Sequence, residues 1–280
     1  MMMLDLICID CIMEKVNKGI PYTGPCEPIM TPFNEVNNTG IYEVNCSKDH
    51  KSKTIIDNID FEILFEYGIN AIADGYYRES VTSITSAMER YFEFFIKVIL
   101  RASNVDFLLI DKIWKNISSQ SERQFGAYII GYSQTFGEIP LLVNPNKDVP
   151  FRNSVIHKGY IPSKDEAISY GNTVMQVIDL SLLKLKSKYP KITNEVFDYY
   201  GYKRTAQEIF KKIEKETGIQ QNYACVNILT TIDVKNGREH DKTDGRKGAI
   251  EQRIPYILDY RGPRKLILLK GKSKQKKASR

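Results

Sequence analysis

The sequence predicts a mainly α-helical protein with a small module at its N-terminus and an α+β extension at its C-terminus. Apolar residues recur at three- and four-residue spacing through the middle of the chain, cysteines are closely spaced near its start, and β-branched residues gather near its end. We place the boundaries at residues 1–57, 58–190 and 191–280. With 280 residues, 42% of them hydrophobic, the chain is long enough to fill cores of ordinary size.

The N-terminal module carries two residue pairs that can ligate a metal ion. Cys8 and Cys11 form a Cys-x2-Cys pair, and Cys46 and His50 form a Cys-x3-His pair after a Gly- and Pro-rich stretch. Thiolate and imidazole groups are preferred ligands of zinc, and four protein ligands indicate a structural rather than a catalytic site. The pattern resembles a zinc ribbon, which implies a structural Zn²⁺ at these residues. Cys26 is an alternative to His50 as the fourth ligand, and packing of the thiols without a metal is the other alternative.

The composition indicates a cytoplasmic protein that is not inserted in a membrane. Its longest apolar runs, such as residues 266–269, fall far short of the roughly 20 residues that span a bilayer. The first residues lack the basic start and small-residue cleavage site of a signal peptide. In a reducing compartment the five cysteines are expected to bind metal or pack in a core, and not to form disulfides.

The middle of the chain predicts a bundle of about five helices. Residues 61–103 split at residues 74–80 into two helical patterns, and two more segments begin at Asp106 and Ser121, which we expect to act as caps. The expected core residues are Phe61, Leu64, Phe65, Gly68, Ile69 and Ile72 in the first helix and Val81, Ile84, Met88, Tyr91, Phe92, Phe95, Val98 and Ile99 in the second.

A short helix is expected at residues 149–158, just before the last long helix of the bundle. Asp148 is its expected cap, Pro150 is tolerated in the first turn, and Gly159 can end it in the left-handed conformation. Ser163 and Glu166 have the spacing of a capping box and predict the start of the long helix. The expected buried face of that helix consists of Val174, Val177, Ile178, Ser181, Leu182 and Leu185.

The short helix carries Arg152, Asn153 and His157 in the stretch "FRNSVIHKGY". An Arg followed by Asn and then by His, just before the final long helix of a bundle, resembles the HEPN superfamily. Residues 73–98 also resemble the first helical hairpin of that family, so that the resemblance covers roughly Asn58 to Tyr189. It implies an up-and-down helical bundle and metal-independent cleavage of RNA at a dimer interface.

The residue types suit that chemistry, because RNA carries its own nucleophile in the ribose 2′-OH. His157, with an ordinary pKa of about 6.5, can act as general base or acid at neutral pH. Arg152 presents a planar charged fork to phosphate oxygens, and Asn153, four residues before His157, lies on the same helical face. The resemblance also implies a polar residue on the second helix, and Glu89 is our candidate partner for Arg152.

Each chain supplies one such histidine, so a second has to come from a homodimer partner. We therefore expect a dimeric endoribonuclease, of the kind used as toxins or antiviral defence effectors, with RNA as substrate and a protein partner such as an antitoxin or regulator. The first alternative is a non-catalytic HEPN module that binds a nucleotide, nucleic acid or protein. The second is a zinc-dependent regulator that binds DNA.

The C-terminal third predicts helices and strands in succession. Residues 193–218 predict one or two helices capped by Thr193 or Asn194, residues 222–234 predict a strand, and residues 255–269 predict a hairpin. Residues 264–280 hold eight Lys or Arg and no acid, which leaves 32 basic and 34 acidic residues elsewhere. This basic tail suits a phosphate backbone, and a solubilising terminus is the alternative.

Overall fold

The chain forms two compact units in the computed structural model. The structure describes residues 2, 4, 6, 8–19, 36–46, 48–228, 230–235 and 249–258. A helical unit contains Ile59–Tyr199 and the described part of Thr230–Pro255, and a second unit contains the described parts of Met2–Asn58, Tyr200–Leu229 and Tyr256–Arg280. Instead of the three consecutive parts that we predicted, segments from both ends of the chain therefore share one unit.

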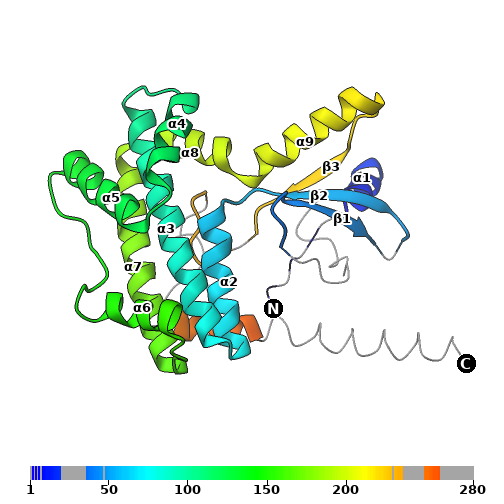
Figure 1. Ribbon diagram of the computed structural model, residues 1–280. Helices are drawn as coiled ribbons and strands as arrows, with labels where there is room; N and C mark the ends of the chain where they lie inside the picture. The colour runs from blue at the N-terminus through cyan, green and yellow to red at the C-terminus, as the bar shows by residue number, and fades with distance from the viewer. Residues whose placement is uncertain are drawn as a thin grey trace, which may run out of the picture. The chain divides into compact units, whose positions relative to one another are not determined.

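The helical unit is built around its longest helix, which contacts five others (Figure 1). The helices are α2 (Asp60–Asp74), α3 (Tyr77–Ala102), α4 (Phe107–Ile117), α5 (Ser121–Phe136), α6 (Asp148–Lys158), α7 (Lys164–Lys188) and α8 (Pro190–Tyr200), and residues 250–255 of a further helix also belong to this unit. α3 contacts α2, α4, α5, α6 and α7. Its aromatic side chains form much of the core, where the rings of Phe92 and Tyr128 stack with centroids 4.2 Å apart.

The predicted apolar faces are buried with two exceptions. All six residues expected on the buried face of α7 are buried, whereas Leu64 on α2 and Ile99 on α3 are half-buried. The break between α2 and α3 falls at Gly75, whose φ of 84° is left-handed and therefore suits glycine. The mainly helical class that the periodicity predicts is confirmed. The structure also contains a small sheet, which lies in the second unit.

Two of the predicted helix caps are confirmed. Asp106 accepts a hydrogen bond from the backbone N–H of Leu109 at 2.9 Å, and Ser163 and Glu166 form the expected capping box. The predicted cap at Ser121 is wrong, because Ser121 is the first helical residue and Gln120 precedes it without a side-chain cap.

The expected caps of α6 and α8 are also wrong. Asp148 is the first residue of α6, and its carboxylate turns back to accept the N–H of Asn144 at 2.8 Å. The Asn144 side chain instead accepts the N–H of Lys147 at 3.1 Å. α8 begins at Pro190, before Thr193 and Asn194, because proline is well suited to the first helical position.

Gly68 lies where α2 and α3 approach closely. A Cβ atom at this position would lie 2.5 Å from Ile84 Cγ1 and 3.2 Å from the backbone oxygen of Ser80. We expect Gly68→Ala to destabilise the protein by about 1–3 kcal/mol, since overpacking outweighs the gain in helix propensity of about 1 kcal/mol. Gly126→Ala in α5 is the matched control, because no atom lies within 4 Å of its added Cβ. Denaturant unfolding measures both, and equal stability of the two variants would contradict the expectation.

The second unit contains a three-stranded sheet of order β1-β2-β3 with two helices (Figure 1). β1 (Ile41–Asn45) and β2 (Lys51–Ile56) are antiparallel, and β3 (Tyr223–Val226) pairs with β2 in parallel. The helices are α1 (Ile9–Asn17) and α9 (Tyr202–Thr217). Ala206 and Phe210 of α9 pack with Ile55 of β2 in a small core. β1 leads to Cys46. The predicted strand at residues 222–234 is confirmed only over Tyr223–Val226, because residues 227, 228 and 230–234 are not part of a strand.

The predicted hairpin near the C-terminus is wrong where the structure describes it. Residues 250–258 are helical, so the segment from Pro255 to Leu258 is not a strand. Ile250 and Ile254, four residues apart, are buried, and Gly171 of α7 lies against Ile250. The remainder of that hairpin, the basic tail and Cys26 lie outside the described residues. No helix in the described ranges combines the length and apolar character needed to cross a bilayer.

Candidate functional site

The four predicted metal ligands lie together in the second unit. The sulfur atoms of Cys8, Cys11 and Cys46 and a ring nitrogen of His50 are all within 4.8 Å of one another. Cys11 Sγ lies 3.7 Å from Cys46 Sγ and 3.4 Å from His50 Nδ1. The three cysteines are buried and the histidine is half-buried. Three sulfurs and one imidazole converging on a single point form a donor set that could hold a metal ion.

The two ligand pairs lie on different local structures. Cys8 precedes the first residue of α1 and Cys11 lies in its first turn, while Cys46 and His50 flank the loop that joins β1 to β2. In this loop Asp49 adopts a left-handed φ of 62°, a conformation that Asp tolerates better than most residues. The first pair therefore lies at the start of a helix, whereas the second lies in the loop of a β-hairpin.

Two of the thiols have strongly shifted pKa values. Burial, together with the neighbouring sulfurs of Cys46 and Cys8, raises the pKa of Cys11 to about 12. Burial also acts to raise the pKa of Cys46, but hydrogen bonds from the backbone N–H groups of Lys48 and His50 and from the neighbouring thiols outweigh it and lower this pKa to about 7. The close approach of the three sulfur atoms therefore disfavours deprotonation of a further thiol. A bound cation would supply the positive charge that compensates for the thiolates.

Glu14 contacts the candidate metal site, a contact that the sequence did not reveal. Its Oε1 atom lies 3.1 Å from His50 Nε2, and its other oxygen pairs with Lys48. A carboxylate that holds the distal nitrogen of a histidine orients the ring and fixes which nitrogen faces the metal. Glu14 follows Cys11 by three residues, a spacing that places both side chains on one side of a helix. This spacing could have identified Glu14 from the sequence, but we did not predict the helix α1.

The Arg/His motif lies on α6 in the helical unit. α6 spans Asp148–Lys158 and ends at Gly159 with a left-handed φ of 74°, which agrees with the predicted short helix. Arg152 Nη2 lies 3.2 Å from Glu89 Oε1 on α3, and Arg152 Nη1 donates to Asn153 Oδ1 at 2.8 Å. The structure thus brings three of the four candidate catalytic residues together, in the pairing that we expected for Glu89.

His157 is not part of that cluster. Its ring is exposed near the C-terminal end of α6 and makes no hydrogen bond to any residue that the structure describes. The side chains of Arg152 and Glu89 are 21% and 26% exposed, so the ion pair can still be reached from solvent. The imidazole is therefore free to meet a substrate or a second copy of the chain.

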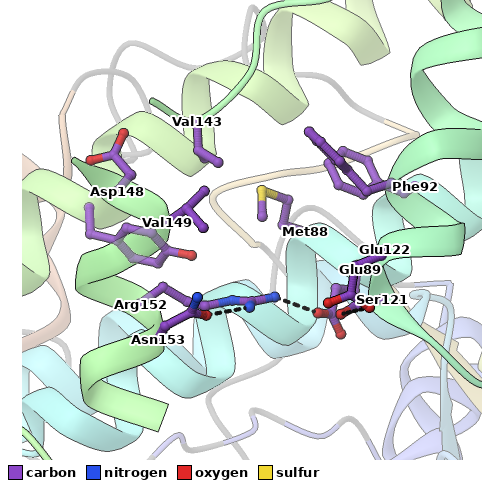
Figure 2. Close-up of a pocket in the computed structure, with 12 residues that line it drawn as sticks. Met88, Glu89, Phe92, Ser121, Glu122, Val143, Asp148, Val149, Arg152 and Asn153 are labelled. Atoms are coloured by element: carbon purple, nitrogen blue, oxygen red, sulfur yellow. Dashed lines mark hydrogen bonds and ion pairs between the residues drawn. The ribbon is translucent and has the colours of Figure 1, made fainter. Parts of the chain in front are cut away.

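A pocket of about 180 Å³ opens beside this ion pair. Figure 2 shows the Arg152 guanidinium extending along one side of it towards Glu89, with Met88, Val143 and Val149 on the other side. The apolar lining residues are Met88, Phe92, Phe125, Val143, Val149 and Tyr170. The polar ones are Glu89, Ser121, Glu122, Asp148, Arg152 and Asn153.

No family model, curated protein or solved structure matches this chain. The likeness to the HEPN superfamily therefore rests on the residues of the motif and on their place before the last long helix. The pocket was not predicted, because its lining comes from α3, α5, α6, α7 and the segment before α6, and no single stretch of sequence shows that they converge.

Proposed function

We propose that the protein is a metal-independent endoribonuclease of the HEPN type. The observation that supports this most is the arrangement on α6, where an oriented guanidinium at Arg152 lies five residues before an exposed imidazole at His157. Two of the five N–H groups of Arg152 are used by Glu89 and Asn153, which leaves three for phosphate oxygens. Fixed orientation and remaining donor capacity are the properties that phosphate binding requires.

The reaction proceeds by attack of the ribose 2′-oxygen on the adjacent phosphorus. A general base takes the 2′-OH proton, the new P–O2′ bond forms, and the P–O5′ bond breaks as an acid protonates the leaving oxygen. The products are a 2′,3′-cyclic phosphate and a 5′-OH. His157 carries one proton transfer, Arg152 neutralises charge on the phosphorane, and Glu89 and Asn153 hold the guanidinium in place.

The second proton transfer comes from His157 of another copy in a homodimer. A two-fold axis beside α6 would bring two Arg152/His157 sets into one cleft, so activity depends on dimerisation. In this proposal the Cys/His cluster holds Zn²⁺ as a structural ion and takes no part in the chemistry. RNA is the substrate, and a regulatory protein such as an antitoxin is the expected further partner.

The second candidate function is a binding module without catalysis. It is favoured by the Glu89–Arg152 ion pair, because a carboxylate already neutralises the guanidinium that would face the phosphate. Such a module would still bind nucleotides or nucleic acid at α6, but it would leave the RNA intact.

We expect His157→Ala to lower RNA cleavage by about 10²–10⁴-fold, the usual contribution of a general acid or base. The measurement uses labelled RNA without added metal, in EDTA at a concentration at which the metal content of the protein stays unchanged. His240→Ala is the matched control, since His240 is the remaining histidine of the sequence and is not among the predicted residues of either site. Cyclic phosphate ends that disappear only in the His157 variant support the enzyme. Equal background in all three proteins, with RNA still bound, identifies the binding module.

A further inference from the structure

We infer that the pocket beside Arg152 binds a nucleobase of the RNA and that it prefers guanine. This inference rests on the proposed function, because it places the base of the attacking nucleotide next to the guanidinium that holds its phosphate. The three features that carry it are the apolar interior of the pocket, the acidic side chains around it, and its sharing of Arg152 with the motif on α6.

The interior suits a flat ring with a polar edge. The rings of Phe92 and Phe125 lie 5.9 Å apart at an angle of 45°, and Met88 and Val149 continue the apolar surface. On the opposite side lies the guanidinium of Arg152 (Figure 2). Unstacked RNA bases are commonly bound between apolar or aromatic side chains and guanidinium planes. A volume of about 180 Å³ admits one planar ring system.

The charges exclude a phosphate from the interior and select a base that donates hydrogen bonds. Three carboxylates, Glu89, Glu122 and Asp148, line the pocket against the single positive charge of Arg152. A phosphate group would be repelled by these carboxylates, whereas a neutral base with N–H groups would find hydrogen-bond acceptors in the pocket. The phosphate is then left at the N–H groups of Arg152 that Glu89 and Asn153 do not use.

Glu122 is the carboxylate best placed to read the base. Glu89 is held by Arg152, and one oxygen of the buried Asp148 accepts the N–H of Asn144. Glu122 is exposed, and its only hydrogen bond within the described residues is a 3.5 Å contact from Ser121. Its carboxylate can therefore turn towards a ligand at little cost.

Guanine matches a free carboxylate better than the other bases. Its N1–H and its 2-amino group point the same way, so both oxygens of one carboxylate accept a hydrogen bond. Adenine and cytosine offer one amino group beside an acceptor nitrogen, and uracil offers one N–H between two carbonyl oxygens. A carboxylate faces a lone pair in each of these three bases, which lowers their affinity.

The first experiment measures binding and does not depend on cleavage. The full chain is titrated with 3′-GMP and with 3′-UMP by calorimetry, using wild type, Glu122→Gln and the matched control Glu79→Gln. Glu79 is exposed in the first turn of α3 and does not line the pocket. We expect 3′-GMP to bind at least about tenfold more tightly than 3′-UMP. That preference should fall to about twofold or less in Glu122→Gln and stay unchanged in Glu79→Gln.

The second experiment maps cleavage sites on an RNA that presents all four bases in unpaired segments. We expect cuts on the 3′ side of guanosine, and an even distribution over the bases in Glu122→Gln. Binding of 3′-GMP without any cleavage would remove the proposed ribonuclease and leave the pocket inference standing. Cleavage without base preference, or equal binding of both nucleotides, would overturn the pocket inference and leave the ribonuclease standing. A preference for guanine that Glu122→Gln retains would also overturn it, since the carboxylate would then have no part in recognition.

Discussion

Removal of metal from the cluster of Cys8, Cys11, Cys46 and His50 is expected to unfold the part of the second unit that contains α1 and the β1–β2 hairpin. The cluster links α1 to this hairpin, because each of the two elements supplies two ligands. Metal binding to structural sites of this kind contributes about 10–16 kcal/mol in isolated zinc-binding peptides. That contribution is as large as the whole stability of a typical domain, about 5–15 kcal/mol.

Apolar side chains of the N-terminal segment and of β1 are buried, among them Leu4, Tyr42 and Val44. One core cluster of this unit, formed by Ile55, Ala206 and Phe210, lies between the sheet and α9 and includes no residue of α1. Without the metal, the three buried thiols would also be left with few partners, and the raised pKa of Cys11 favours its uncharged form. The N-terminal segment is therefore expected to depend on the ion as well as on packing.

The test combines metal analysis with thermal unfolding. We expect one Zn²⁺ per chain after purification, and a lower melting temperature after treatment with a strong chelator or in Cys11→Ser. Cys225→Ser is the matched control, since Cys225 is exposed on β3 and outside the cluster. Cys26→Ser tests whether Cys26 is the fourth ligand in place of His50, because this variant lowers the metal content only if Cys26 binds the ion. A chain that purifies without metal and melts at the same temperature in chelator would refute the site.

The second large effect is expected at Glu66, a buried carboxylate on α2. Its Oε2 atom accepts hydrogen bonds from the backbone N–H and the hydroxyl of Thr231, each at 2.8 Å. Its Oε1 atom lies 2.9 Å from Arg253 Nη2, and the two side chains are only 5% and 6% exposed. This carboxylate therefore holds two distant segments of the C-terminal region against α2.

Glu66→Ala is expected to destabilise the helical unit by about 3–5 kcal/mol, because it removes one partner of a buried ion pair and the acceptor of the buried Thr231 N–H. The double variant Glu66→Met with Arg253→Met should recover much of this loss, since an apolar pair of similar volume removes the desolvation cost of both ions. Denaturant unfolding measures each variant. A loss below about 1 kcal/mol in the single variant would show that water or other groups reach the guanidinium.

The matched control is Glu208→Gln on α9, which breaks an ion pair with Arg204. The side chains of this pair are 59% and 36% exposed, so that solvent already screens their charges. We expect a change below about 1 kcal/mol, in contrast to Glu66→Ala. Similar losses at both positions would contradict the assignment of the Glu66 effect to burial.

Local patterns account for most of the helices that the sequence predicts correctly. The apolar spacing in α3 and α7 identifies their buried faces because one face of a helix repeats about every 3.6 residues, whatever it packs against. The capping box at Ser163 and Glu166 is also local, since both residues serve the same turn. The predicted cap at Asp148 failed because its carboxylate accepts the backbone N–H of Asn144, outside the helix.

Periodicity and spacing were enough to predict that the middle of the chain is helical, which faces of those helices are buried, and which residues can gather around a metal ion, with Cys26 left open as an alternative to His50. Which distant segments meet follows only from the fold. It pairs β3 with β2 across more than 160 residues and joins Glu66 to Arg253 across 187 residues. It also makes residues 250–258 helical against our expectation of a strand, and it assembles the pocket beside Arg152 from several helices. Periodicity and spacing record the geometry of one element, whereas such contacts depend on how the surfaces of different elements fit.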